Sequence, residues 1–122
     1  MRSFAQFCYQ EAAFLAACAD PQAVRKRIKY LRRELAGYIK TCPEFLVSLE
    51  PLQSLPGDPP EIAIRMHRAS VKIGVGPMAA VAGTVAQMAA EEALLRGSPE
   101  AIINNGGDIY LSIVEEAVVG LY

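Results

Sequence analysis

The spacing of apolar residues changes once along this chain, and that change constrains the fold more than any other feature. Up to Arg96, apolar residues recur every three or four positions, which is the period of an amphipathic helix. Gly97 and Pro99 interrupt the pattern, and from Ala101 onward apolar residues alternate with others, as they do in strands. Helices followed by strands predict an α+β fold, in which the helices pack on a small β-meander.

Apolar spacing, capping residues and breaks predict helices in the first three quarters of the chain. Asp20 and Pro21 are a typical N-cap and first helical residue, and the segment PLQSLPGDPP at 51–60 has the composition of a loop. Alanine content and aromatic residues favour a helix at the amino terminus as well. The predicted helices are 3–18, 22–40, 61–73 and 78–96, with a short helical turn at 44–49.

Three strands are predicted after the helices, at 101–104, 108–113 and 117–122. Three strands form a small sheet in comparison with the number of residues predicted to be helical. An apolar strand at the end of the chain would also leave one edge of the sheet without a hydrogen-bonding partner. We therefore treat 1–122 as a single, incomplete domain. We expect residues of a longer polypeptide, or another chain in a homo-oligomer, to complete the sheet.

The charge balance does not favour nucleic acid as a partner, and contact with nucleic acid through a basic helix is kept only as a minor hypothesis. Lysine and arginine together number 12 and the acidic residues 13, which gives a formal net charge of −1. Seven of the basic residues lie in the helix predicted at 22–40, and we interpret them as its solvated face because no exposed aromatic residues are interleaved with them. They are Arg25, Lys26, Arg27, Lys29, Arg32, Arg33 and Lys40.

Cysteine usage and hydropathy favour a cytoplasmic protein without a membrane span. Cys8, Cys18 and Cys42 are far apart and form no C-x-x-C pair, which argues against a zinc site or a disulfide framework. Polar residues interrupt the apolar amino terminus, so an export signal is not predicted. The alanine- and glycine-rich stretch at 75–90 is too weakly hydrophobic for a span, and we interpret it as a buried helix.

The histidine and the methionines carry little functional information. His67 lies in the helix predicted at 61–73, between Met66 and Arg68, with no cysteine or second histidine near it in sequence. We interpret His67 as a surface or boundary residue. Met66, Met78 and Met88 are most simply explained as core residues, because methionine fills irregular gaps in packed interiors.

The segment IGVGPMAAVAG, at 73–83, has two interpretations. Pro77 suits a first helical turn, and the glycines before it would let a ligand approach the backbone. A helix N-terminus also favours an anion such as a phosphate. The alternative is that the small residues, including Gly83, serve close packing of the helix on the sheet.

The segment IINNGGDIYLS, at 102–112, interrupts a strand pattern with residues that pack poorly. Asn105, Gly106 and Gly107 can all reach positive φ, so a hairpin turn is sufficient to explain them. The second glycine and Asp108 also leave bare backbone beside a carboxylate, which could hold a hydroxyl group or a metal ion.

These two glycine motifs together resemble a bacterial and archaeal branch of the ApbE-like family, whose namesake enzymes are FAD:protein FMN transferases. The resemblance covers roughly residues 30–122 and includes YIKTCPEFLVSLEPL and the helix around Met66. It implies an ApbE-like α+β fold that binds FAD with magnesium, and an acceptor protein whose hydroxyl would attack the FAD pyrophosphate. The residues that match the family's flavin-binding motifs are Gly76, Pro77, Met78, Gly83, Asn105, Gly106, Gly107 and Asp108.

The chain departs from the family pattern in two ways. It has no lysine in the helix-start motif, and it lacks the second half of the family's length, which carries the magnesium-binding carboxylate. We therefore assign no catalytic residue and no metal ligand, and expect a flavin-nucleotide-binding domain that acts as an FMN transferase when complete. The alternative is a non-enzymatic structural or assembly domain whose glycines serve packing only.

Overall fold

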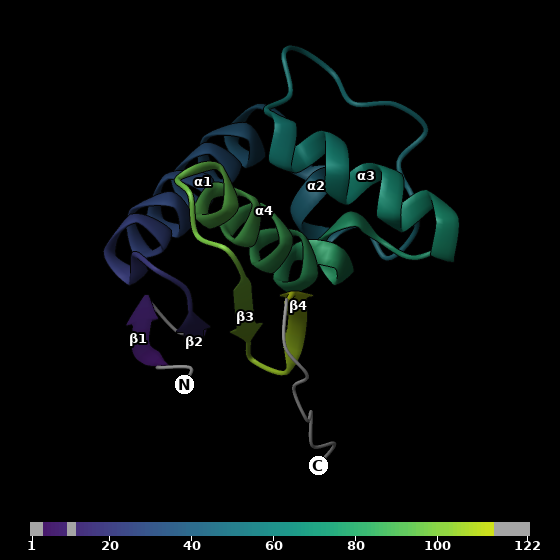
Figure 1. The fold of residues 1–122 in the computed structure, drawn as a ribbon. Coiled ribbons are helices and arrows are strands. Elements are labelled where there is room, and N and C mark those ends of the chain that lie inside the picture. The colour runs from purple at the N-terminus through teal and green to yellow at the C-terminus, as the bar shows by residue number, and fades with distance from the viewer. Residues whose placement is uncertain (1–3, 10–11, 114–122) are drawn as a thin grey trace.

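The computed structural model describes residues 4–9 and 12–113, and it places a layer of helices over one face of an antiparallel sheet (Figure 1). Strands come from both ends of the described chain, and the helices lie between them in sequence. The elements are β1 Ala5–Tyr9, β2 Ala12–Ala17, α1 Pro21–Thr41, α2 Glu44–Val47, α3 Glu61–Ile73, the 3₁₀ helix η1 Pro77–Ala80, α4 Val81–Leu95, β3 Ala101–Asn105 and β4 Asp108–Ser112.

The four described strands are ordered β1-β2-β3-β4, and each neighbouring pair is antiparallel. Two of the pairs join neighbours in sequence, whereas β2 and β3 are separated by all the helices (Figure 1). Their register pairs Ala16 with Ile103, and both side chains are fully buried. The sheet therefore forms only when the two ends of the described chain come together.

The prediction of a helix at 3–18 is wrong, because this region contains β1 and β2. Phe7 and Phe14 pair across these strands and their rings stack with centroids 5.4 Å apart. Phe14 and Ala16 are buried beneath the helix layer. Alanine-rich sequence favours a helix locally, but burial against β3 and the helices outweighs a preference of about 0.5 kcal/mol per residue.

The predicted order of helices first and meander second is therefore wrong, although the α+β class is confirmed. The strands expected within 101–113 belong to a larger sheet. In the described part of the chain, the further strands of that sheet are β1 and β2, from the amino-terminal region. The strands predicted at 101–104 and 108–113 correspond to β3 and β4. The strand predicted at 117–122 lies outside the described residues.

The helices predicted from apolar spacing are confirmed with small shifts of their ends. The Asp20 side chain accepts a hydrogen bond from the Ala23 amide at 3.1 Å, as an N-cap should. The helix predicted at 78–96 is divided into η1 and α4. Among the described residues, no single helix could cross a membrane by length and apolar character. The segments Glu61–Ile73 and Pro77–Leu95 meet that test only as a pair, which is bent by 105°.

The core lies between the helix layer and the face of the sheet that carries Ile103 and Tyr110. α1 and α4 supply most of the helical contribution, and α4 packs against both β3 and β4. Met66 and Met88 are buried and Met78 packs partly buried against the same core, so the interpretation of these methionines is confirmed.

His67 anchors the loop at 51–60 to α3. Its Nε2 lies 2.8 Å from the Leu52 carbonyl oxygen, and the half-buried ring therefore has a structural partner. A carbonyl can only accept, so Nε2 carries the proton in this contact. The boundary role predicted for His67 is confirmed.

The two cysteines whose surroundings are described, Cys18 and Cys42, are free thiols. Cys42 is buried beside α1, and burial raises the pKa of the half-buried Cys18 thiol. A raised pKa lowers the thiolate fraction near neutral pH. Cys18 is therefore poorly suited to act as a nucleophile.

Tyr38 makes the protein sensitive to high pH. Its hydroxyl donates a hydrogen bond to the Pro56 carbonyl at 2.7 Å, and burial raises its pKa above the ordinary value of 10.0. The folded chain therefore keeps this proton at a pH where the unfolded chain loses it, and stability falls as pH rises above about 10. We expect Tyr38→Phe to weaken the fall, measured by urea unfolding at pH 8 to 11. An unchanged slope would contradict the prediction.

Candidate functional site

The turn between β3 and β4 presents bare backbone at the surface. Gly106 and Gly107 have φ values of 59° and 107°, and residues that carry a side chain rarely adopt such a backbone conformation. The Asn104 side-chain oxygen accepts a hydrogen bond from the Gly107 amide at 2.9 Å. A Cβ built on either glycine would meet nothing within 4 Å, so both face open space.

The same turn contacts the amino-terminal part of α4. Asn105 and Asp108 are paired across the hairpin, and the Asn105 side-chain amide donates to the Ala82 carbonyl at 3.1 Å. A Cβ on Gly83 would lie 3.8 Å from Oδ1 of Asp108. The structure therefore brings Gly83 and the turn residues Gly106–Asp108 into one exposed surface, named here the hairpin surface, whereas Asn105 itself is buried.

Gly76 and Pro77 have a different environment. Both are buried, and a Cβ on Gly76 would fall 1.8 Å from the Ser48 carbonyl oxygen. Close approach of two backbones explains this glycine without a ligand. Gly76 precedes η1, and its carbonyl accepts a hydrogen bond from the Ala79 amide at 3.2 Å. These two residues, together with the half-buried Met78, form the packed base of the helix start.

Among the described residues, Asp108 supplies the carboxylate of the hairpin surface. Within residues 4–9 and 12–113, no group of three or more histidine, cysteine, aspartate or glutamate side chains could hold a metal ion. A magnesium ion prefers near-octahedral oxygen coordination, although several ligands can be water. Among the described residues of the hairpin surface, Asp108 is therefore a single candidate ligand.

Gly83 gives a direct test of whether its missing side chain serves packing. It is exposed within a helix, and a Cβ there would make only ordinary contact with Asp108. We expect Gly83→Ala to raise the free energy of unfolding by about 0.5–1 kcal/mol. Gly37→Ala, in α1 with open space around it, is the matched control and should give a similar gain in urea unfolding. A loss of stability only at position 83 would show that packing requires this glycine.

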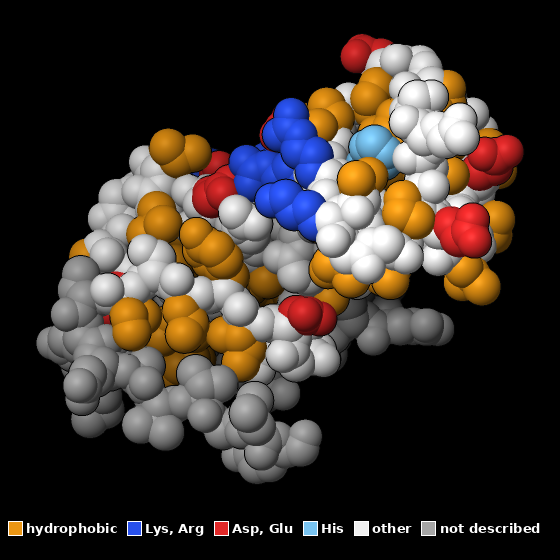
Figure 2. Space-filling view, turned by 90° about the vertical axis from the view of Figure 1, so that its right-hand side faces the viewer, with side chains coloured by type: hydrophobic (Ala, Val, Ile, Leu, Met, Phe, Trp, Pro, Cys, Tyr) orange, Lys and Arg blue, Asp and Glu red, His pale blue; other side chains and the backbone are white. Residues whose placement is uncertain are grey.

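A cleft of about 500 Å³ lies between α3 and α4. On the face shown in Figure 2, lysine and arginine side chains gather near the centre, with hydrophobic areas on both sides. Arg65 donates to Glu61 at 3.2 Å and to Glu91 at 2.8 Å, and the hydrogen bond to Glu91 is the main cause of its raised pKa. The residues that line the cleft are Glu61, Arg65, Arg68, Ala69, Lys72, Gln87 and Glu91.

This cleft was not predicted from the sequence, although a signal was present. Residues 61, 65, 68 and 72 follow helical spacing, as do 83, 87 and 91. Either series alone is typical of an exposed helix surface. Only the packing of α3 against α4 places the two series opposite each other.

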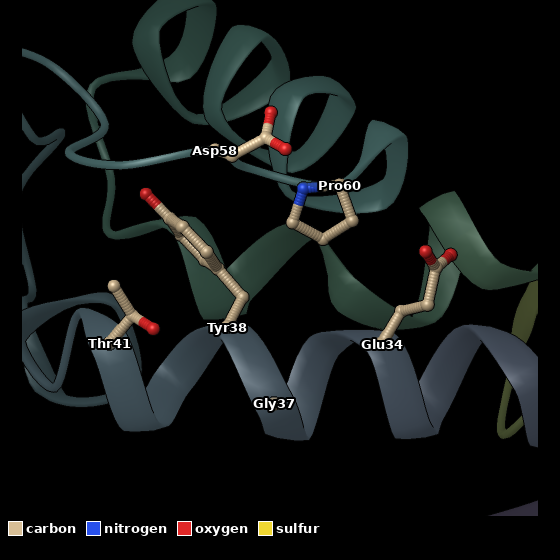
Figure 3. A pocket seen from close by; sticks show the side chains of 6 residues that line it. All are labelled: Glu34, Gly37, Tyr38, Thr41, Asp58 and Pro60. Carbon is tan, nitrogen blue, oxygen red and sulfur yellow. The ribbon is translucent and has the colours of Figure 1, made fainter.

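A second hollow, of about 260 Å³, lies between α1 and the loop that precedes α3. Figure 3 shows Glu34, Tyr38 and Thr41 extending from α1 toward Asp58 and Pro60. The Tyr38 hydroxyl already donates to the Pro56 carbonyl. The hollow has two carboxylates and no described cation in its lining, so it resembles a solvated surface depression more than a site.

The basic residues of α1 do not form a uniform exposed stripe. Lys26, Arg33 and Lys40 are exposed, whereas the other four are half-buried. The Arg27 guanidinium lies over the Tyr30 ring, 5.4 Å from its centroid. Tyr30 is 51% exposed, so the prediction that no exposed aromatic residue is interleaved with these basic residues is wrong, although Lys26, Arg33 and Lys40 do lie on an exposed face.

The fold defines an α+β domain in which helices cover one face of an antiparallel sheet and a glycine turn meets the start of α4. Residues 11–122 match a family described as "AbpE bacteria", and the chain belongs to this family. The match covers 112 residues, and only the first ten residues of the chain lie outside it.

Archaeal relatives named "UPF0280 protein" are similar to this chain. The protein of Methanocella arvoryzae is 40% identical over 124 residues, covering 100% of this chain and 50% of the relative. That of Archaeoglobus fulgidus is 38% identical over 125 residues, covering 100% and 52%. That of Methanothermobacter thermautotrophicus is 48% identical over 91 residues, covering 75% and 35%. The chain thus spans about half the length of the first two relatives.

Proposed function

We propose that this chain is an ApbE-like, flavin-nucleotide-binding domain that holds FAD against the hairpin surface. The observation that supports the proposal most is the contact between the two glycine motifs through Asn105 and Ala82, and through Asp108 and Gly83. Exposed glycines allow a flat ligand to approach the main chain, whose free polar groups can then bind it. Asp108 adds a carboxylate that can accept a hydrogen bond from a ligand hydroxyl.

The proposal assigns different roles to the matching residues. Gly83 and Gly106–Asp108 form the exposed surface for the ligand, and the buried Asn105 fixes the turn to α4 through the Ala82 carbonyl. Gly76 and Pro77 are buried and fix the start of η1, so their contribution to binding is indirect. FMN transfer to an acceptor hydroxyl is proposed only for a polypeptide of the full length of the relatives, and no catalytic base is assigned.

The test uses flavin fluorescence and calorimetry during titration of the 122-residue chain with FAD. Gly83→Phe should fill the hairpin surface and lower FAD affinity by about tenfold or more, since it blocks the bare backbone. Gly37→Phe, at an exposed glycine of α1, is the matched control and should leave affinity unchanged. Absence of binding of FAD, FMN and ADP to the wild-type chain would contradict the proposal.

A second candidate function is a structural or assembly domain, and exposed hydrophobic side chains favour it. Val47, Leu49 and Ile73 are 70%, 89% and 73% exposed. The Leu49 backbone lies beside Gly76, which is three positions after Ile73 in sequence. Exposed apolar clusters are typical of interaction surfaces. Light scattering distinguishes the two functions: a stable dimer without flavin affinity favours assembly, and a monomer stabilised by FAD favours binding.

A further inference from the structure

We infer that the cleft between α3 and α4 binds the phosphate groups of the nucleotide whose flat part is proposed to rest on the hairpin surface. This inference rests on the proposed function for the identity of the ligand. The phosphate-binding side chains would be Arg68 and Lys72, which carry no ligand role in the glycine motifs.

Arg65 is already neutralised by neighbouring carboxylates. Its guanidinium contacts Glu61 at 3.2 Å and Glu91 at 2.8 Å, and those two are the only acidic residues in the lining of the cleft. Arg68 and Lys72 are exposed, and the described part of the chain contains no ion pair to either. The lining therefore carries three cations and two carboxylates, a net charge of +1, and Arg68 and Lys72 are the cations that remain available to a phosphate or pyrophosphate anion.

The two cations lie on the same face of α3. Residues 65, 68 and 72 are separated by three and four positions, which places them one above another along a helix. All three line the cleft, together with Gln87 from α4. An anion in the cleft could therefore contact both Arg68 and Lys72.

Helix α4 connects the cleft with the hairpin surface. At one end a Cβ added to Gly83 would lie 3.8 Å from Oδ1 of Asp108, and Gln87 lines the cleft one helical turn further along. Positions four apart lie on the same helix face, about 6 Å apart along the axis. This span is short compared with an extended dinucleotide, so one ligand can reach both places.

The experiment titrates three probes into the 122-residue chain by calorimetry: FAD, riboflavin and inorganic pyrophosphate. The test variant is the double substitution Arg68→Gln and Lys72→Gln. The control is Lys26→Gln with Arg33→Gln, which removes the same charge from exposed positions of α1. Circular dichroism checks that each variant retains the fold, as expected for exposed side chains.

We expect the double variant to lose about tenfold or more in affinity for FAD and for pyrophosphate, because charged hydrogen bonds are removed. Riboflavin, which has no phosphate, should bind the variant and the wild type equally, and the control should change no affinity more than about twofold. Wild-type affinity for FAD in the double variant would overturn the inference. Absence of pyrophosphate and FAD binding to the wild type would overturn it as well.

The outcomes separate this inference from the proposed function. Pyrophosphate binding that requires Arg68 and Lys72, without any flavin binding, would support the cleft and contradict the flavin proposal. FAD binding that is lost in Gly83→Phe but unaffected by the double variant would support the proposed function and overturn the inference about the cleft.

Discussion

Gly76→Ala is expected to destabilise the protein more than any other glycine substitution considered for this chain. The added methyl group would lie 1.8 Å from the Ser48 carbonyl oxygen and 2.8 Å from its carbonyl carbon. Both atoms belong to the backbone, which cannot rotate away as a flexible side chain can. Separation of the two segments would cost about 3 kcal/mol or more.

Urea unfolding followed by circular dichroism measures this effect. The φ of Gly76 is −68°, which any residue adopts, so the expected loss comes from the steric contact and not from backbone strain. Gly37→Ala provides the contrast, since it adds the same methyl group where nothing lies within 4 Å. A Gly76→Ala protein with wild-type stability would show that the segment at 48–49 does not lie against η1 as described.

Phe45→Ala is the second substitution with a large expected effect. Phe45 is fully buried in the four-residue helix α2, and its ring meets Tyr38 edge to face with centroids 5.7 Å apart. Removal of a buried phenyl ring leaves a cavity and costs about 3–5 kcal/mol. So short a helix has little stability of its own, and therefore depends on this side chain for its position.

The comparison with Leu46→Ala makes this prediction specific. Leu46 is the next residue in α2 but is 50% exposed, so its truncation should cost less than about 1 kcal/mol. The difference between the two variants in urea unfolding measures how firmly α2 is anchored to α1. Equal losses would contradict the described packing of this segment.

These two predictions concern the same part of the molecule, which positions the start of η1. Phe45 holds α2 against α1, and the following segment at Ser48 and Leu49 packs on Gly76. η1 and α4 begin at that point, and α4 then reaches Gly83 and the hairpin surface. Loss of stability at Phe45 or Gly76 would therefore weaken the proposed ligand surface indirectly.

Local sequence was sufficient to predict most of the helical layer. The helix from Pro21 to Thr41 was expected from its apolar spacing and from the cap at Asp20, and its buried stripe includes Val24 and Ile28. The prolines and the glycine at 51–60 predicted a loop because these residues interrupt helices and strands locally. These signals act between residues only a few positions apart, so they need no knowledge of the tertiary structure.

The amino-terminal strands could not be predicted in the same way. Ala16 and Ala17 have strong local preference for a helix, but their burial against β3 decides the conformation. Their register partners, Ile103 and Ile102, lie more than 80 positions away in sequence. Strand pairing over such a separation leaves no short-range pattern that distinguishes it from an alanine-rich helix.

In the candidate site, too, some features follow from local sequence and others depend on contacts between distant segments. The positions of the turns and of the missing side chains follow from local sequence, because glycine, proline and asparagine act through their own φ and ψ preferences. The role of each missing side chain depends on packing between distant segments: Gly76 receives the Ser48 backbone, Gly83 leaves room beside Asp108, and α3 faces α4 to form the basic cleft. Those outcomes depend on contacts between distant segments, which local preferences do not encode.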